Sequence, residues 1–147
     1  MNKPKLAIAA DHAGIHLKQF LKDELKELEL VDFGTNSSES VDYPDFASKA
    51  CAAVISGECE KAILICGTGI GMSIAANKIR GIRAAHVESV FTAQMCGEHN
   101  AANVICIGER VTGTSHALSM VRAWLHAKFE SRHQKRLDKI TALEKKL

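Results

Sequence analysis

Hydrophobic residues recur along the chain at two alternating spacings. Residues 5–10 form a short, unbroken apolar run, as expected of a buried strand, and residues 14–28 carry large apolar side chains every three or four positions, as expected of an amphipathic helix. The same alternation continues to residue 126. It predicts strands at 5–10, 30–33, 61–66, 83–87 and 103–108, and helices at 14–28, 44–55, 69–79, 89–98 and 114–126.

Strands that alternate with helices in this way predict an α/β fold. The strands are nearly continuous apolar runs, which is typical of a parallel sheet covered by helices on both faces. We therefore predict a three-layer α/β/α sandwich built on a Rossmann-like, five-stranded parallel sheet. Residues 1–147 are expected to form a single domain, because 147 residues support one substantial core.

An extra C-terminal helical arm is predicted over about residues 131–147. Its apolar positions follow spacings of three and four, at Leu137, Ile140, Leu143 and Leu147. A basic terminal helix of this kind is most often a packed or solvated tail. The alternative is an arm that reaches a partner subunit.

Composition narrows the functional classes. The net charge of +2, from 19 basic and 17 acidic residues, predicts neither nucleic acid nor a membrane surface as a partner. The sequence has no apolar run long enough to span a membrane and no signal-peptide pattern, so a cytoplasmic location is expected. The five cysteines include no C-x-x-C pair, which favours reduced thiols over disulfides or a zinc site.

Polar side chains follow four of the predicted strands. In open parallel sheets, ligands bind beyond the carboxyl ends of the strands, so these side chains are expected to converge on one rim. The segments are Asp11-His12-Ala13-Gly14, Val41-Asp42-Tyr43, Cys66-Gly67-Thr68-Gly69-Ile70-Gly71 and Gly108-Glu109-Arg110.

The glycine loop is the most specific of these segments. Gly67, Gly69 and Gly71 allow backbone N–H groups to approach an anion at the start of a helix. The loop therefore predicts a phosphate or oxyanion site. A dinucleotide site remains an alternative, since Glu88 follows about twenty residues later, although Met72 stands where that fingerprint has its third glycine.

Cys66 ends a strand directly before this loop. The helix dipole and the loop amides favour its thiolate, which can act as a base. The alternative is an inert buried cysteine. Thr68 adds a hydroxyl to the loop, and it is equally suited to capping the helix.

Arg132 and Arg136 lie four residues apart and hence on one face of a predicted helix. Two guanidinium groups match the geometry of a phosphate, whereas the alternative is solvated surface charge. His12 and His16 also share a helical face, but without a third ligand they predict no metal site.

His99 and Asn100 present a geometric problem. They follow the helix that returns the chain from the fourth strand to the fifth, so they belong at the rim opposite Cys66. If His99 is catalytic, it is expected to serve the site of a neighbouring subunit. Otherwise it is an ordinary loop histidine.

Seven segments, taken in order, resemble one known family over essentially the whole chain: the type B ribose-5-phosphate isomerases. The segments are Asp11-His12-Ala13-Gly14, Asp42-Tyr43-Pro44-Asp45, Cys66-Gly67-Thr68-Gly69-Ile70-Gly71, Ala76-Asn77-Lys78, His99-Asn100, Gly108-Glu109-Arg110 and Arg132-His133-x-x-Arg136.

The resemblance implies a sugar-phosphate isomerase of the pentose phosphate pathway. Such an enzyme interconverts ribose 5-phosphate and ribulose 5-phosphate through a cis-enediolate without a metal or organic cofactor. It is a homodimer with shared active sites, in some members assembled further into a tetramer. The resemblance assigns the proton transfer to Cys66, oxyanion binding to Thr68 and the loop amides, and ring opening to His99 from the second subunit. It assigns the phosphate to His12, Arg110, Arg132 and Arg136, and the sugar hydroxyls to Asp11, Tyr43 and Asn100.

The sugar itself stays open at this stage. The same superfamily includes galactose-6-phosphate isomerase subunits, and some type B enzymes also act on allose 6-phosphate. A non-catalytic module that binds a phosphosugar or a nucleotide is a further alternative, because a fold by itself does not determine a function.

Overall fold

The apolar runs form the strands of one parallel sheet. A computed structural model of the chain describes residues 2–146 and places five strands in the order β2-β1-β3-β5-β4, with every neighbouring pair parallel. The strands are β1 (Lys5–Ala10), β2 (Glu29–Asp32), β3 (Lys61–Cys66), β4 (Ala84–His86) and β5 (Val104–Gly108).

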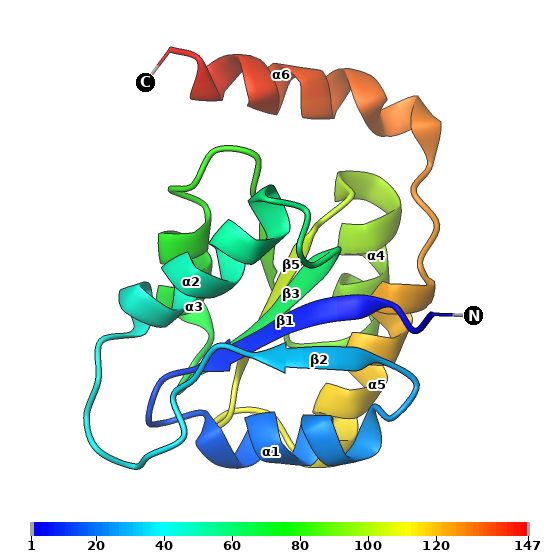
Figure 1. Cartoon of the computed structure of the whole chain (residues 1–147). Coiled ribbons are helices and arrows are strands. Elements are labelled where there is room, and N and C mark those ends of the chain that lie inside the picture. Colours follow the sequence, from blue (N-terminus) through cyan, green and yellow to red (C-terminus); the bar gives the residue numbers. More distant parts are fainter. Residues whose placement is uncertain (1, 147) are drawn as a thin grey trace.

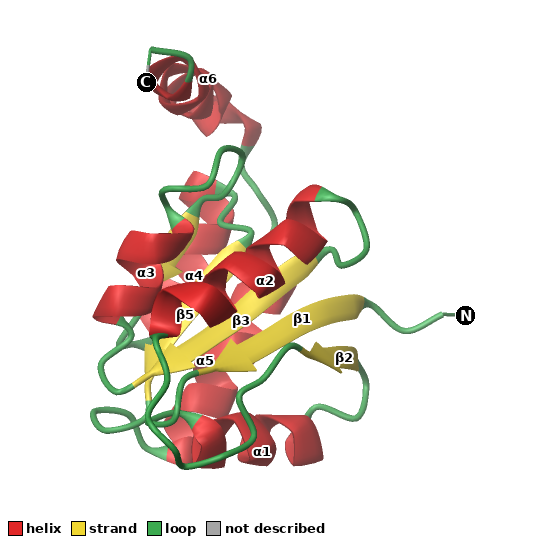
Figure 2. Ribbon diagram, turned by 60° about the vertical axis from the view of Figure 1, so that its left-hand side comes forward, coloured by secondary structure: helices red, strands yellow, loops and turns green. Residues whose placement is uncertain are grey.

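Helices cover both faces of this sheet, as Figures 1 and 2 show. They are α1 (Ile15–Glu24), α2 (Tyr43–Ile55), α3 (Ile70–Ala76), α4 (Val90–Asn100) and α5 (Thr114–His126). The buried side chains of α1, α4 and α5 pack on one face, and those of α2 and α3 pack on the other. The predicted α/β/α sandwich with a parallel sheet is therefore confirmed.

The alternation of side chains along the strands divides the core into two parts. In β3, Ile63 and Ile65 point toward α1, α4 and α5, whereas Leu64 and Cys66 point toward α2 and α3. Successive side chains of a strand lie on opposite faces, so a strand buried on both sides is apolar at every position. This geometry explains the uninterrupted apolar runs, and it places the Cys66 side chain on the α2 and α3 face.

Two helices are shorter than their apolar spacing predicts. The first was expected to reach residue 28, but α1 ends at Glu24, and the buried Leu25 and the half-buried Leu28 pack against the core from a turn. Helix α3 was expected to reach residue 79, but it ends at Ala76. The next residue, Asn77, exchanges two side-chain hydrogen bonds with the backbone of Ala84, at 2.8 and 2.9 Å, and so ties the chain to β4. Apolar side chains pack against the core from turns as well as from helices, so the spacing of apolar residues alone does not determine where a helix ends.

The chain ends in a short 3₁₀ turn, η1 (Ser131–His133), and the helix α6 (Gln134–Glu144). Figure 1 shows α6 beyond the end of the sandwich opposite the arrowheads of the strands. A pocket of about 440 Å³ lies between α6 and the chain around Asn77 and Ala84, and the Gly81 N–H donates to the Glu144 carboxylate at 3.0 Å.

The predicted apolar stripe of α6 is only partly covered. Leu137 is buried, but Ile140 and Leu143 remain 40% and 60% exposed, and Leu147 lies outside the described residues. Among residues 2–146, no helix has the length and apolar character needed to cross a bilayer.

Candidate active site

The segments that follow β1, β3 and β5 lie side by side at the carboxyl end of the sheet. The Asp11 N–H donates to the Ile65 carbonyl at 3.2 Å, and the Glu109 N–H donates to the Cys66 carbonyl at 2.9 Å. The Arg110 N–H donates to the Gly67 carbonyl at 3.0 Å. Backbone hydrogen bonds thus continue the sheet past its last strand residues and hold three of the predicted segments together.

Cys66 lies at the base of this rim, with its sulfur facing the glycine loop. The side chain is buried, and Sγ accepts a hydrogen bond from the Gly69 N–H at 3.1 Å. Gly69 has a φ of 80°, and a Cβ at this position would lie 2.9 Å from the His86 ring and 3.0 Å from the Ile107 carbonyl carbon. Both the left-handed backbone and the lack of space therefore require glycine, and this conformation directs the N–H toward the sulfur.

Two further glycines of the loop make room for site residues from other elements. A Cβ on Gly67 would lie 3.1 Å from the Arg110 guanidinium, and one on Gly71 would lie 2.6 Å from the Tyr43 ring. Arg110 and Tyr43 thus lie directly against the loop. The glycines were predicted to let an anion approach the backbone, and here they also admit these two side chains.

Thr68 is exposed in the same loop. Its hydroxyl oxygen accepts a hydrogen bond from the Ile70 N–H at 3.3 Å, but the N-cap of α3 is Gly69, so Thr68 stands one residue before the cap position. The hydroxyl hydrogen remains able to donate to a ligand. The Thr68 carbonyl accepts a hydrogen bond from His86 Nε2 at 2.8 Å, so His86 fixes the loop from the end of β4.

The segment between β1 and α1 adds a carboxylate and an imidazole to the rim. Asp11 is buried, and its carboxylate accepts a hydrogen bond from the Ala13 N–H at 3.0 Å. His12 accepts a hydrogen bond from the Val41 N–H through Nδ1 at 3.2 Å, so its Nε2 carries the proton and can donate to an anion. The Glu109 carboxylate accepts from the Leu17 N–H at 2.5 Å, which joins α1 to the end of β5.

Sequence reasoning did not assign His86 and Glu109 any role. Both stand at or just after the carboxyl end of a strand, which was the signal used for the other site residues. Their hydrogen bonds to backbone atoms, over 18 and 92 positions of sequence, are visible only in the folded chain.

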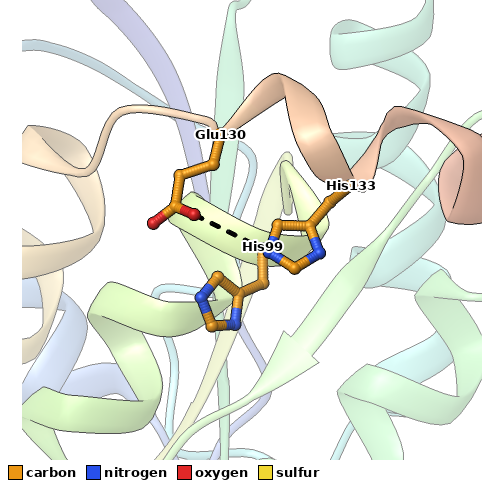
Figure 3. A group of neighbouring side chains, drawn as sticks. All are labelled: His99, Glu130 and His133. Carbon is orange, nitrogen blue, oxygen red and sulfur yellow. Dashed lines mark ion pairs between the residues drawn. The ribbon is translucent and has the colours of Figure 1, made fainter.

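The remaining predicted residues lie at the opposite end of the sandwich. Helix α4 starts beyond the carboxyl end of β4 and ends before β5 begins, so His99 and Asn100 lie at the amino ends of the strands. The helix was expected to end at about residue 98, but α4 reaches Asn100, so His99 stands in its last turn. In Figure 3 its ring lies beside the carboxylate of Glu130 and the ring of His133. The two imidazole centroids are 4.5 Å apart and their planes are tilted by 40°.

The two arginines belong to different local structures rather than to one helix. Arg132 lies in η1 and Arg136 in the first turn of α6, because the chain enters the arm through a 3₁₀ turn. The Arg132 Nε donates to the Glu130 carboxylate at 2.6 Å, and Arg136 Nη1 donates to His133 Nδ1 at 2.5 Å. The hydrogen bond from Arg132 lowers the pKa of Glu130, and burial together with the nearby Arg132 charge lowers the pKa of His133.

Donor atoms of His99, Glu130 and His133 lie within 4.8 Å of one another, close enough to suggest a metal site. The hydrogen bonds argue against that use. Because a guanidinium cannot accept, His133 Nδ1 must, and the Nε2 that faces the other two side chains then carries a proton. The Glu130 carboxylate likewise accepts from Arg132. The two arginines therefore occupy the atoms that would bind an ion, and we assign the cluster no metal.

The predicted site residues of one chain therefore form two groups, which lie at opposite ends of the sheet. The group at the carboxyl end of the sheet contains Asp11, His12, Tyr43, Cys66, Gly67, Thr68, Gly69, Gly71 and Arg110. The group at the amino end contains His99, Asn100, Arg132 and Arg136. The first offers a thiol, loop amides and two side-chain donors, His12 and Arg110. The second offers an imidazole and two guanidinium groups.

Comparison with known proteins gives consistent matches along the chain. A family model described as ribose/galactose isomerase matches residues 6–140. Ribose-5-phosphate isomerase B of Escherichia coli is 47% identical over 145 residues, covering 97% of each chain. A D-erythrulose-4-phosphate isomerase of Pectobacterium atrosepticum is 42% identical over 128 residues, covering 85% of this chain and 84% of its own. The solved structure of Clostridium thermocellum ribose-5-phosphate isomerase B has 52% identity and a TM-score of 0.94, and the match covers 97% of this chain and 98% of that one.

Proposed function

This chain belongs to the ribose/galactose isomerase family, and from that premise we propose that it interconverts ribose 5-phosphate and ribulose 5-phosphate with Cys66 as the base. That it is an isomerase follows from the relatives at this level of identity. The observation that carries the finer proposal is the contact between the Cys66 sulfur and the Gly69 N–H at 3.1 Å, in a loop that also adjoins Arg110 and Tyr43.

The substrate phosphate is held by cationic and N–H donors. We assign it to His12 and Arg110 of one chain and to Arg132 and Arg136 of a second chain. His12 is suited to this role because its Nε2 carries the proton, and paired guanidinium groups match the phosphate oxygens. Binding at the phosphate also orients the open-chain sugar, so part of this binding energy lowers the barrier to proton transfer.

Ring opening precedes proton transfer, because ribose 5-phosphate is mainly a closed furanose. The bond between C1 and the ring oxygen breaks, the ring oxygen gains a proton and the anomeric hydroxyl loses one. The imidazole of His99 relays this proton, since one ring nitrogen can give its hydrogen to the ring oxygen and recover another from the anomeric hydroxyl.

The Cys66 thiolate then removes the proton from C2. The C2–H electron pair forms the double bond of a cis-enediolate, and negative charge develops on the oxygen at C1, where the Thr68 hydroxyl and the loop amides donate to it. The thiol returns the proton to C1, while the hydroxyl proton of C2 passes to the oxygen at C1. The product is the ketose, and the thiolate is regenerated.

Two features support a homodimer with shared sites. His99 and Cys66 lie at opposite ends of one chain, whereas the reaction needs both at one sugar. Large apolar side chains of α3, α4 and α6 are also exposed, with Ile74 56%, Phe91 69% and Leu143 60% exposed. Apolar side chains in such number favour burial against a partner, and a second copy of the chain would supply the missing residues.

Turnover of defined sugars tests the proposal. Ribose 5-phosphate, allose 6-phosphate and erythrose 4-phosphate should be assayed in parallel, since the similarity to a D-erythrulose-4-phosphate isomerase favours a four-carbon substrate as the second candidate. We expect the highest kcat/KM with ribose 5-phosphate. A higher value with another sugar would overturn the substrate assignment, and binding without turnover of all three would favour the non-catalytic alternative.

A further inference from the structure

His133 holds a buried nitrogen that the proposed reaction does not yet use. The residue is only 4% exposed, and its Nε2 has no hydrogen-bond partner. Its Nδ1 accepts a hydrogen bond from Arg136 at 2.5 Å, so in the neutral ring the proton lies on Nε2. A buried donor without an acceptor is unfavourable and rare, so this N–H requires an explanation.

The neighbours of this N–H are limited. The Glu130 Oε2 lies 3.8 Å away, beyond hydrogen-bond distance, and it already accepts from Arg132 at 2.6 Å. The other group of the cluster is His99, whose ring lies against that of His133 at a centroid distance of 4.5 Å (Figure 3). One nitrogen or oxygen atom of each of the three side chains lies within 4.8 Å of those of the other two, so His99 is near enough for a side-chain rotation to bring a ring nitrogen to His133 Nε2.

We propose that His133 is a positioning residue that orients the His99 ring and fixes its tautomer for ring opening. When its N–H donates to one nitrogen of neutral His99, the proton of His99 must lie on the other nitrogen. That second nitrogen is the one that faces the sugar and relays the proton. The inference rests on the ring-opening role proposed for His99.

The same contacts connect the residues proposed for phosphate binding with the residue proposed for ring opening. Arg136, assigned to the phosphate, donates to His133, and His133 in turn faces His99. The guanidinium sets which nitrogen of His133 carries the proton, and His133 sets the same for His99. Once His133 Nε2 donates to His99 as proposed, a hydrogen-bonded series runs from Arg136 to the imidazole of His99.

Ring opening can be measured separately from isomerisation. In a Cys66→Ala background the C2 proton stays in place, but a sugar that opens and closes still exchanges its α and β anomers. Magnetisation-transfer NMR on ribose 5-phosphate labelled with ¹³C at C1 measures this exchange directly. We expect Cys66→Ala dimers to accelerate the exchange, and Cys66→Ala/His99→Asn dimers to do so no longer.

Two substitutions of His133 distinguish the effect of its ring from the effect of its N–H donor. His133→Phe keeps a flat ring beside His99 and removes both nitrogens, whereas His133→Gln places an amide N–H near the position of Nε2. At saturating sugar, we expect His133→Phe to slow the enzyme-catalysed exchange at least about tenfold, and His133→Gln to retain a larger share of it. Calorimetric titration with ribose 5-phosphate and native mass spectrometry control for phosphate binding and dimer assembly.

Each outcome bears on the proposal. Undiminished exchange in the His133→Phe dimers would overturn it, and so would equal losses in the Phe and Gln variants, because the loss would then not depend on the donor. If Cys66→Ala dimers do not accelerate the exchange at all, the ring-opening step proposed for this site is itself wrong. The positioning role then falls with it.

Discussion

The sulfur of Cys66 accepts a hydrogen bond from the Gly69 N–H at 3.1 Å. A thiolate accepts such a bond more strongly than a thiol does, so the contact favours the charged sulfur that a base needs. Burial raises the pKa of Cys51 and of Cys96 to about 11, so both thiols stay protonated at neutral pH. Cys66 is the cysteine whose sulfur lies against the glycine loop, held there by the Gly69 N–H.

Replacing Cys66 by alanine should lower kcat on ribose 5-phosphate by about 1000-fold, because the variant lacks the proposed base for the C2 proton. Calorimetric titration should show that the variant still binds the sugar phosphate. Cys51→Ala is the matched control, since it removes a buried thiol from α2 and should leave kcat within about twofold. Near-normal turnover by Cys66→Ala would assign the base to another residue, with Asp11 the first candidate.

Alkylation should test the role proposed for Cys66. Cys51 and Cys96, with pKa values of about 11, stay protonated at neutral pH and react slowly with iodoacetamide. We expect inactivation to follow modification of Cys66, and ribose 5-phosphate to slow it. Peptide mapping by mass spectrometry identifies the modified residue. First modification at a different cysteine would contradict this assignment.

Activity should resist chelation. The chemistry proposed here uses a sulfur, an imidazole and backbone amides, and none of these steps requires a bound ion. Prolonged dialysis against EDTA should leave kcat and KM unchanged when compared with dialysis against buffer alone. If activity were lost and then restored by a divalent cation, the metal-independent mechanism would be wrong.

Gly69→Ala should damage both stability and activity. A left-handed alanine is destabilised by about 1 to 2 kcal/mol, and here its Cβ would also displace His86 and the end of β5. Gly57 is a matched control, because its φ of 81° is nearly the same but a Cβ there meets nothing within 4 Å. Chemical denaturation should show a loss for both variants. Only Gly69→Ala should lower kcat. If the two variants had the same kcat, the conformation of the glycine loop would not matter for catalysis.

A buried ion pair should make stability depend on pH. The Lys18 ammonium, 2% exposed, donates to the Asp32 carboxylate at 2.7 Å. Burial by itself raises the pKa of Asp32, but hydrogen bonds from Lys18 and Lys22 outweigh it, so the pKa is lowered overall. A carboxylate with a lowered pKa stabilises the fold above its unfolded pKa, and this contribution is lost as the pH falls through the folded value.

Asp32→Asn should therefore lower the free energy of unfolding by about 3 kcal/mol at pH 7, because it leaves the Lys18 charge buried without its counter-ion. The difference from the unsubstituted chain should shrink as the pH falls below about 4. Glu27→Gln, which breaks an exposed pair with Arg122, should change the free energy of unfolding by less than about 1 kcal/mol. Urea denaturation across a range of pH measures the unsubstituted chain and both variants. An Asp32→Asn loss that does not depend on pH would contradict the role given to this ion pair.

Mixed dimers should reveal shared sites. Cys66→Ala and His99→Asn homodimers are each expected to be severely impaired. When they are unfolded, mixed equally and refolded together, half of the dimers combine both chains, and each of these holds one intact site. Activity should then recover to about a quarter of the unsubstituted level. If both residues act within one chain, every site carries a lesion and mixing recovers nothing, provided that mass spectrometry confirms the mixed dimers.

Much of the fold was predictable because its signals are local. A strand buried on both faces must be apolar at each position, so β1, β3 and β5 are visible as apolar runs with accurate bounds. Strand ends were predictable for the same reason, and they located Cys66 and Arg110 at one rim. The end of α1 was not predictable from the sequence. Leu25 follows the helix but packs in the core, so the helical spacing of apolar residues continues past the last helical residue.

The sequence by itself determined the layers, the direction of the strands and the chemistry present at the rim, since these depend on side chains within a few positions of one another. Only the tertiary structure decided which groups meet. It brought His86 to the glycine loop, Glu109 to the start of α1 and His133 to the ring of His99. Such contacts join residues 18 to 92 positions apart, and they depend on strand order and on the path of the terminal arm, which no local spacing of apolar residues encodes.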